Sequence, residues 1–307
     1  MRITYISVYL THQQEHFMKN PRILVPTDFS ELSMLAFPNA VYLAKLFGGT
    51  VSPFHAYMQV SELDGFYYMG ETSPEADLRT LEKSLYQRLE ELSKKHIDEK
   101  YRGEPLIKIG NAARAICEAS LDFDLIIMSS HGRTGFSRLI LGSICEKVLR
   151  TCEKPVLVLE EQSRLIPLER ILLTTDFSDN SIYAFEPAAE FAEATGAVID
   201  LIHIVSYEQF DTLAQAQHDS SERKQKLQSL AEKYLGDLGD QVQTEVIFSD
   251  KAVHEELAVL TKSRAYNLVV MATIGRTGLD YMMLGSTSSS VMRHVKTAVL
   301  SVNPGKP

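Results

Sequence analysis

Residues 21–57 read "PRILVPTDFSELSMLAFPNAVYLAKLFGGTVSPFHAY", and residues 169–205 read "ERILLTTDFSDNSIYAFEPAAEFAEATGAVIDLIHIV". The two stretches align without a gap at an offset of 148 residues, and 14 of the 36 positions from Arg22 and Arg170 onward are identical. In each stretch an aliphatic run, a polar turn, an amphipathic segment and a second apolar run follow one another, which is typical of a strand–helix–strand unit. Because this unit occurs twice, the sequence predicts two copies of one α/β domain.

Each copy continues with three further apolar runs that are bounded by turn residues, and such runs predict buried parallel strands. The predicted strands are 22–27, 50–57, 104–110, 124–130 and 155–160 in the first copy, and 170–175, 197–205, 242–249, 267–273 and 297–302 in the second. Residues 75–101 carry the clearest amphipathic helix pattern. Pro53 inside the second strand indicates a bulge or a later strand start. Right-handed crossovers between these strands make each copy a doubly wound parallel sheet flanked by helices.

The repeat also divides the chain of 307 residues, a length that suits about two domains. Residues 1–17 are interpreted as a poorly ordered N-terminal extension, with a start at Met18 as the alternative. The first domain is predicted over 18–160, a linker over 161–168, and the second domain over 169–304. Because the last strand of each domain is apolar and is expected at a sheet edge, the two domains are predicted to pack on one another as a pseudo-dimer.

Composition excludes several classes of partner. The net charge is −9 and no Lys/Arg cluster occurs, which argues against nucleic acid and anionic membranes as partners. No apolar run approaches the roughly 18 residues that cross a bilayer. The three cysteines show no metal-ligand spacing and are interpreted as reduced thiols of a cytoplasmic protein.

Two glycine loops follow the fourth predicted strands. Residues 128–143 read "MSSHGRTGFSRLILGS" and residues 271–286 read "MATIGRTGLDYMMLGS", with Gly-Arg-Thr-Gly, six residues and Gly-Ser in common. Each loop leads into a predicted helix, and a glycine loop before a helix N-terminus can bind an anion through backbone amides. Ser143 is predicted to open a capping box that ends at Glu146.

The turn after each first strand is the second part of the predicted site. Asp28 and Asp176 fall at the carboxyl ends of these strands, where ligands of open parallel sheets bind. Ser30 and Ser178 are predicted to cap the helices that follow. The sequence therefore predicts a binding site at this edge of each sheet.

The motif "PTDFSE" together with "SSHGRTG…LGS" resembles the universal stress protein family, and the resemblance covers about 20–160 and 168–303. It implies a five-stranded parallel sheet of order 3-2-1-4-5 in each domain. It also implies ATP or another adenine nucleotide as ligand, with Mg²⁺ left open. Both copies depart from the family motif Gly-x2-Gly-x9-Gly-Ser/Thr, because Ser129 in the first copy and Ala272 in the second replace its first glycine.

The resemblance implies a role for each matching position. Asp28 and the backbone at Ala56 would meet ribose and adenine, Ser129–Gly132 would surround ribose and phosphates, and Gly142–Cys145 would hold the phosphate tail. The candidate nucleotide-binding residues of the first copy are Thr27, Asp28, Ala56, Met128, Ser129, Ser130, His131, Gly132, Arg133, Gly142, Ser143, Ile144 and Cys145. Those of the second copy are Asp176, Ile204, Ala272, Gly275, Arg276, Gly285, Ser286, Thr287 and Ser288.

The two copies are not equivalent at the glycine loops. Ser130 and His131 of the first copy align with Thr273 and Ile274 of the second, so the first copy is predicted to bind nucleotide more tightly. His55 and His203 lie on apolar strands, are interpreted as core residues and are left out of the site.

The favoured interpretation is an adenine-nucleotide sensor or regulatory module without fast catalysis. No catalytic residue and no metal site is assigned, because no Walker A lysine and no carboxylate cluster accompany the loops. A slow ATPase and a nucleotide-free dimerisation scaffold remain the alternatives. The expected partners are the nucleotide, the other domain of the same chain and a second copy of the chain in a homodimer.

Overall fold

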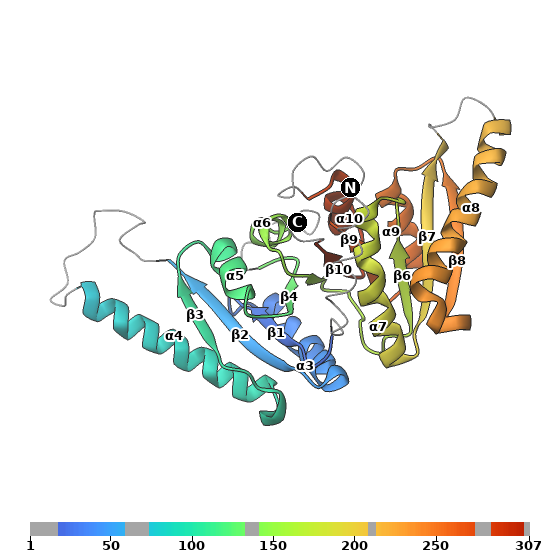
Figure 1. The fold of residues 1–307 in the computed structure, drawn as a ribbon. Coiled ribbons are helices and arrows are strands. Elements are labelled where there is room, and N and C mark those ends of the chain that lie inside the picture. Colours follow the sequence, from blue (N-terminus) through green and yellow to red (C-terminus); the bar gives the residue numbers. More distant parts are fainter. Residues whose placement is uncertain (1–17, 59–73, 133–140, 208–212, 274–283, 304–307) are drawn as a thin grey trace, which may run out of the picture.

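The computed structural model describes residues 18–58, 74–132, 141–207, 213–273 and 284–303. Strands and helices alternate along each half of the chain (Figure 1). The elements of the first half are β1 (Arg22–Pro26), α2 (Glu31–Met34), α3 (Ala36–Phe47), β2 (Thr50–Tyr57), α4 (Pro74–His96), η2 (Glu99–Tyr101), β3 (Leu106–Ile109), α5 (Ala112–Ser120), β4 (Leu125–Ser129), α6 (Ser143–Thr151) and β5 (Val156–Leu159). The elements of the second half are β6 (Arg170–Thr174), η3 (Asp179–Ala184), α7 (Phe185–Thr195), β7 (Val198–Ser206), α8 (Leu213–Leu235), η5 (Gly236–Gln241), β8 (Val242–Ser249), α9 (Val253–Ser263), β9 (Leu268–Ala272), α10 (Ser286–His294) and β10 (Ala298–Val302). The extension at 1–17 lies outside the described residues.

The strands form one sheet of ten, in the order β3-β2-β1-β4-β5-β10-β9-β6-β7-β8. Within each half the strands are parallel in the predicted order 3-2-1-4-5. At the centre β5 and β10 pair in antiparallel fashion, with Leu157 opposite Leu300 and Val158 opposite Val299. Each of these strands therefore covers the edge of the other, as the packing of their apolar residues predicts.

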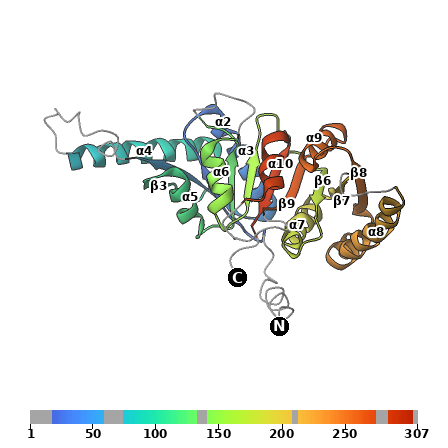
Figure 2. The ribbon, with the colours of Figure 1, turned by 90° about the horizontal axis from the view of Figure 1, so that it is seen from above.

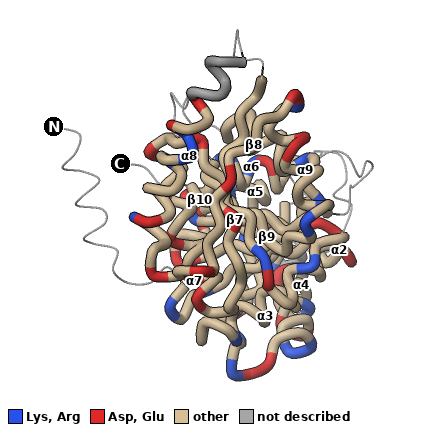
Figure 3. Tube along the Cα trace, turned by 90° about the vertical axis from the view of Figure 1, so that its right-hand side faces the viewer, with Lys and Arg blue, Asp and Glu red and all other residues tan. Residues whose placement is uncertain are grey.

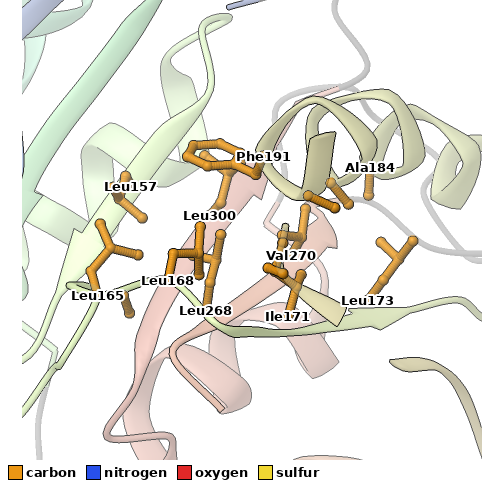
Figure 4. Packing of buried hydrophobic residues seen from close by; sticks show 14 of the residues in the cluster. Leu157, Leu165, Leu168, Ile171, Leu173, Ala184, Phe191, Leu268, Val270 and Leu300 are labelled. Carbon is orange, nitrogen blue, oxygen red and sulfur yellow. The ribbon is translucent and has the colours of Figure 1, made fainter. Parts of the chain in front are cut away.

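Helices cover both faces of the sheet (Figure 2). The core on one face packs residues of α3, α7 and α8, and the core on the other face packs residues of α5, α6, α9 and α10. Both cores extend through both halves without interruption. Near the centre, Leu157, Leu300 and Phe191 lie in one cluster (Figure 4).

The junction of the two halves has contacts beyond the paired strands. Leu165 and Leu168, on the connecting segment, are almost fully buried in the central cluster. The rings of Phe47 and Phe191 meet edge to face with their centroids 5.5 Å apart, which brings α3 against α7. The two halves therefore share one apolar core rather than resting on separate ones.

Two predicted element boundaries differ from the structure. Pro53 lies inside β2, which starts at Thr50, so the predicted bulge or late start was wrong. The strand tolerates proline there because β3 pairs with β2 only from Phe54 onward. The predicted helix over 75–101 ends at His96, and a short 3₁₀ turn follows at Glu99–Tyr101.

The interpretation of all three cysteines as reduced thiols was wrong. Cys117 on α5 and Cys152, which follows α6, form a disulfide, while Cys145 is a buried free thiol. The bond joins two helices that lie on the same face of the sheet. This removes the cysteine-based reason for assigning the chain to a reducing compartment.

Charged residues are dispersed over the outside of the molecule. Figure 3 shows acidic and basic segments interspersed along the helices and connecting loops of the side in view. Among the described residues, no helix combines the length and apolar character that a membrane crossing requires.

Candidate functional site

A hydrogen-bonded turn follows β1 and fixes the orientation of Asp28. Thr27 Oγ1 accepts the Phe29 amide at 2.9 Å, and Asp28 Oδ1 accepts the Ser30 amide at 3.0 Å. Ser30 caps α2 as predicted, because its side chain accepts the Ser33 amide at 3.2 Å. Phe29 has a φ of 63°, a left-handed conformation that costs a non-glycine residue on the order of 1–3 kcal/mol. The surrounding hydrogen bonds hold the turn in this conformation.

The second copy repeats the turn after β6. Asp176 Oδ1 accepts the Ser178 amide at 2.9 Å, and Phe177 has a φ of 64°. Ser178 is the predicted cap and accepts the Ser181 amide at 3.2 Å, although the turns that follow form a 3₁₀ helix first. The same strained turn therefore presents a carboxylate at the carboxyl end of the first strand in both copies.

A histidine of the second strand supports each turn. His55 Nδ1 lies 2.7 Å from the Thr27 carbonyl, so it is the protonated ring nitrogen that donates to this oxygen. The His55 and Phe29 ring centroids are 4.5 Å apart, and the Arg88 guanidinium carbon lies 4.2 Å from the Phe29 centroid. In the second copy His203 Nδ1 contacts the Thr175 carbonyl at 2.8 Å. Both histidines fix the turn that carries the aspartate.

Two glycines let the loop after β4 pack closely, Gly132 against the turn and Gly142 against the loop itself. A Cβ added at Gly132 would lie 2.5 Å from Asp28 Oδ2, and a Cβ added at Gly142 would lie 2.8 Å from the Ser130 carbonyl oxygen. The Gly142 amide donates to this carbonyl at 2.9 Å, and in the second copy the Gly285 amide donates to Thr273 in the same way. The glycines of the motif are therefore needed for packing around the site.

The polar side chains of the first loop mostly bond within the loop. Ser129 Oγ donates to the His131 carbonyl at 2.7 Å. Ser130 Oγ and His131 Nδ1 are 2.8 Å apart and share a hydrogen bond. In the second loop the Thr273 hydroxyl donates to the Val302 carbonyl at 3.3 Å.

The predicted capping box at Ser143 was wrong. Gly142 is the residue that caps α6, Ser143 is the first helical residue, and no side chain caps the helix. Gly285 and Ser286 have the same positions at the start of α10. Because glycine has no side-chain acceptor, the first amides of both helices are left to another partner.

These elements surround a pocket in the first copy, a cleft of about 850 Å³. It brings together every candidate residue of this copy except Arg133, which lies outside the described residues. Further lining residues that the sequence analysis did not assign are Pro26, Ser33, Phe54, His55, Ala112 and Ile116. The phenyl and aliphatic groups among them add apolar surface to the lining, as is usual in small-molecule sites.

The second copy has the equivalent cleft, of about 1040 Å³. Its lining includes the predicted Asp176, Ile204, Ala272, Gly285, Ser286, Thr287 and Ser288. Gly275 and Arg276 lie outside the described residues. Unassigned lining residues are Thr174, Thr175, Ser181, Ile202, His203, Val253, Leu257 and Met271. Thr175 and Met271 align with Thr27 and Met128, so the repeat itself carried the signal for these two.

The chemistry available in these pockets is limited. Burial raises the pKa of the Cys145 thiol well above its usual range, and nearby Glu160 and Glu146 add to this effect, so the thiol stays protonated. No group of three His, Cys, Asp or Glu side chains that could hold a metal ion occurs in the part of the chain that the structure describes. The pockets thus offer shape, backbone amides and hydroxyl groups.

Known proteins match the chain as two successive domains, one in each half. The model of the Universal stress protein family matches residues 19–160 and 167–303. The universal stress protein Slr1230 of Synechocystis is 25% identical over 308 residues, covering 92% of this chain and 99% of the relative. The universal stress protein Rv2005c of Mycobacterium tuberculosis is 28% identical over 190 residues, covering 60% of this chain but only 63% of the relative. The crystal structure of a universal stress protein from Archaeoglobus fulgidus superposes with a TM-score of 0.69 at 22% identity, covering 94% of this chain and 98% of that one, which supports the fold of both halves.

Proposed function

Because the chain belongs to the universal stress protein family, we propose that it binds adenine nucleotides, ATP or a relative, and acts as a sensor or regulatory module without fast catalysis. The observation that carries the proposal is the start of α6 and of α10. Each helix begins at a glycine cap without a side-chain partner and opens into a pocket. Unpaired helix amides in a pocket are a favourable place for phosphate oxygens.

The opposite end of the first pocket suits a nucleobase. Phe54, Ile116 and Met128 line it with apolar surface, and Ala56 leaves room beside them. A lining that combines apolar side chains with a glycine loop suits a base joined to phosphates. Asp28 also lines the pocket, and its carboxylate is a suitable acceptor for a sugar hydroxyl.

The described residues do not supply the groups of a fast phosphotransferase. Asp28 is the one carboxylate among the described residues that line the first pocket, and it already accepts the Ser30 amide. No lysine or arginine stands in that lining. Phosphoryl transfer at enzyme rates needs metal ligands, a cationic clamp and a positioned base or water. Mg²⁺, if bound, would be held by phosphates and water with Asp28 as a single protein ligand.

Measurement of bound nucleotide tests the proposal. Protein purified without added nucleotide is denatured and the released small molecules are identified by mass spectrometry, while ATP and AMP binding is followed by calorimetry. We expect adenine nucleotide to bind, and we expect Gly142→Asp and Gly285→Asp each to remove one site, because each adds a carboxylate at the helix start and, at Gly142, the added Cβ also crowds the Ser130 carbonyl. Binding that survives both substitutions would support the nucleotide-free scaffold instead. ATP turnover of about 1 per second or faster that Gly142→Asp abolishes would support an ATPase.

A further inference from the structure

We propose that the two pockets select different parts of a nucleotide, the first pocket the nucleoside and the second the phosphate tail. This rests on the proposed nucleotide binding. It is carried by the side chains that differ between two otherwise equivalent pockets, above all Ile144 against Thr287 and Ala56 against Ile204.

At the phosphate end, the second pocket is the richer in hydroxyl groups. The first three residues of α10 are Ser286, Thr287 and Ser288, and all three line the pocket, although the Ser288 hydroxyl donates to the Ala272 carbonyl at 3.1 Å. In the first pocket the three equivalent residues begin with a serine, but Ile144 and Cys145 follow it. Ile144 lines the first pocket and is 44% exposed, and it has the position that Thr287 has in the second copy. Loss of a hydrogen bond to a charged group lowers an affinity by about tenfold or more.

The side chains of the loop after β4 do not make the first pocket the better site for phosphate. The predicted tighter binding there counted Ser130 and His131 as phosphate donors. These two side chains share a hydrogen bond with each other, and Ser129 donates to the backbone of His131. The hydroxyl groups of Ser129 and Ser130 and the Nδ1 atom of His131 are thereby committed within the loop, which weakens the reason for that ranking as far as phosphate is concerned.

Among the apolar lining residues, the difference between the two pockets favours the first. The lining of the first pocket includes Ala56, a small side chain next to the almost fully buried Phe54. The second pocket has Ile204 at the position of Ala56, next to the equally buried Ile202. A β-branched side chain at 204 takes room that the methyl group of Ala56 leaves to a planar ring. The first pocket therefore fits a nucleobase better, and the second offers more hydrogen-bond donors to a chain of phosphates.

The test uses the full chain with one pocket disabled at a time. Gly285→Asp leaves the first pocket to be measured alone and Gly142→Asp leaves the second. Each is titrated with adenosine, AMP, ATP and inorganic triphosphate. We expect the ratio of ATP to adenosine affinity to be at least about tenfold larger in the second pocket, and we expect inorganic triphosphate to bind only there.

Single substitutions assign the difference to its residues. Thr287→Val keeps the shape and removes the hydroxyl, and it should lower ATP affinity of the second pocket about tenfold with a far smaller effect on adenosine. Ile144→Thr should raise the ATP-to-adenosine ratio of the first pocket. Ser289→Ala removes a hydroxyl from the same helix outside the pocket lining and is the matched control.

Two outcomes distinguish a failure of the proposed selectivity from a failure of nucleotide binding itself. Equal ATP-to-adenosine ratios in both pockets, or a loss of ATP and adenosine affinity by the same factor in Thr287→Val, would overturn the selection while leaving nucleotide binding intact. Failure of all the nucleotides and of adenosine to bind either pocket would instead refute the proposed function itself.

Discussion

Removing the disulfide between Cys117 and Cys152 should destabilise the protein by an amount that follows from the loop it closes. The two cysteines are 35 residues apart in the sequence, and the loop contains β4 and the whole of α6. A cross-link that closes a loop of this length reduces the entropy of the unfolded chain by the equivalent of about 4 kcal/mol. Because both halves share one core, the unit that unfolds has about 300 residues, and the loss corresponds to a fall in Tm of roughly 6 °C.

The assay compares thermal and guanidinium unfolding of the oxidised protein, the reduced protein and the double variant Cys117→Ser, Cys152→Ser. The oxidised protein should be the most stable of the three, and reductant should not affect the double variant. Thiol titration in denaturant provides the control for redox state. It should find one thiol, that of Cys145, in oxidised protein and three after reduction.

The result that would refute this reasoning is an oxidised protein that unfolds at the same temperature as the reduced protein while thiol titration shows the bond to be formed. That outcome would mean that the cross-link constrains the unfolded chain far less than its loop length indicates. Three titratable thiols in protein never exposed to reductant would show that Cys117 and Cys152 do not form the bond.

Three further predictions concern single side chains. Gly132→Ala should weaken nucleotide binding in the first pocket, because its Cβ would lie 2.5 Å from Asp28 Oδ2, and an unchanged titration in the Gly285→Asp background would contradict this. Cys145 should react with iodoacetamide far more slowly in native than in unfolded protein, because burial raises its pKa and keeps the thiol protonated at mildly alkaline pH. Rapid native labelling detected by mass spectrometry would argue against it. Lys296→Met should lower the free energy of unfolding in guanidinium by no more than about 1 kcal/mol. The side chains of Lys296 and its partner Glu160 are 40% and 10% exposed, so the ion pair is still in contact with water. A loss several times larger would show that this ion pair holds the two halves together.

Much of the fold could be predicted because each strand is an uninterrupted apolar run. Buried parallel strands need apolar residues on both faces, so runs such as 124–130 stand out from the amphipathic helices around them. The pairing of β5 with β10 followed from the same reasoning, since two apolar edge strands in one chain need cover. The order of strands within each half came from the family resemblance rather than from the pattern.

The features that sequence reasoning missed depend on tertiary contacts. Cys117 and Cys152 meet because α5 and α6 pack side by side, and no local spacing indicates this. His55 appeared to be a core residue because its strand is apolar, yet it lies where the strand ends and the pocket begins. The cap of α6 was misplaced by one position because Ser143 has a suitable side chain whereas Gly142 needs its backbone conformation. For the pocket lining, the repeat alignment placed most residues correctly on the strand ends but gave no account of α5 or α9.

The antiparallel pairing of β5 with β10 inside one chain frees the two halves from symmetry. In a dimer of identical single domains, every substitution occurs at both sites and the pairing weakens on dilution. Here the partner strand is tethered, and a short tether supplies an effective concentration in the millimolar range. A substitution can therefore be tolerated or selected in one half while the other half keeps its original form. The disulfide is present in the first half alone, and Ile144 and Thr287 occupy equivalent positions, so the chain has already used this freedom.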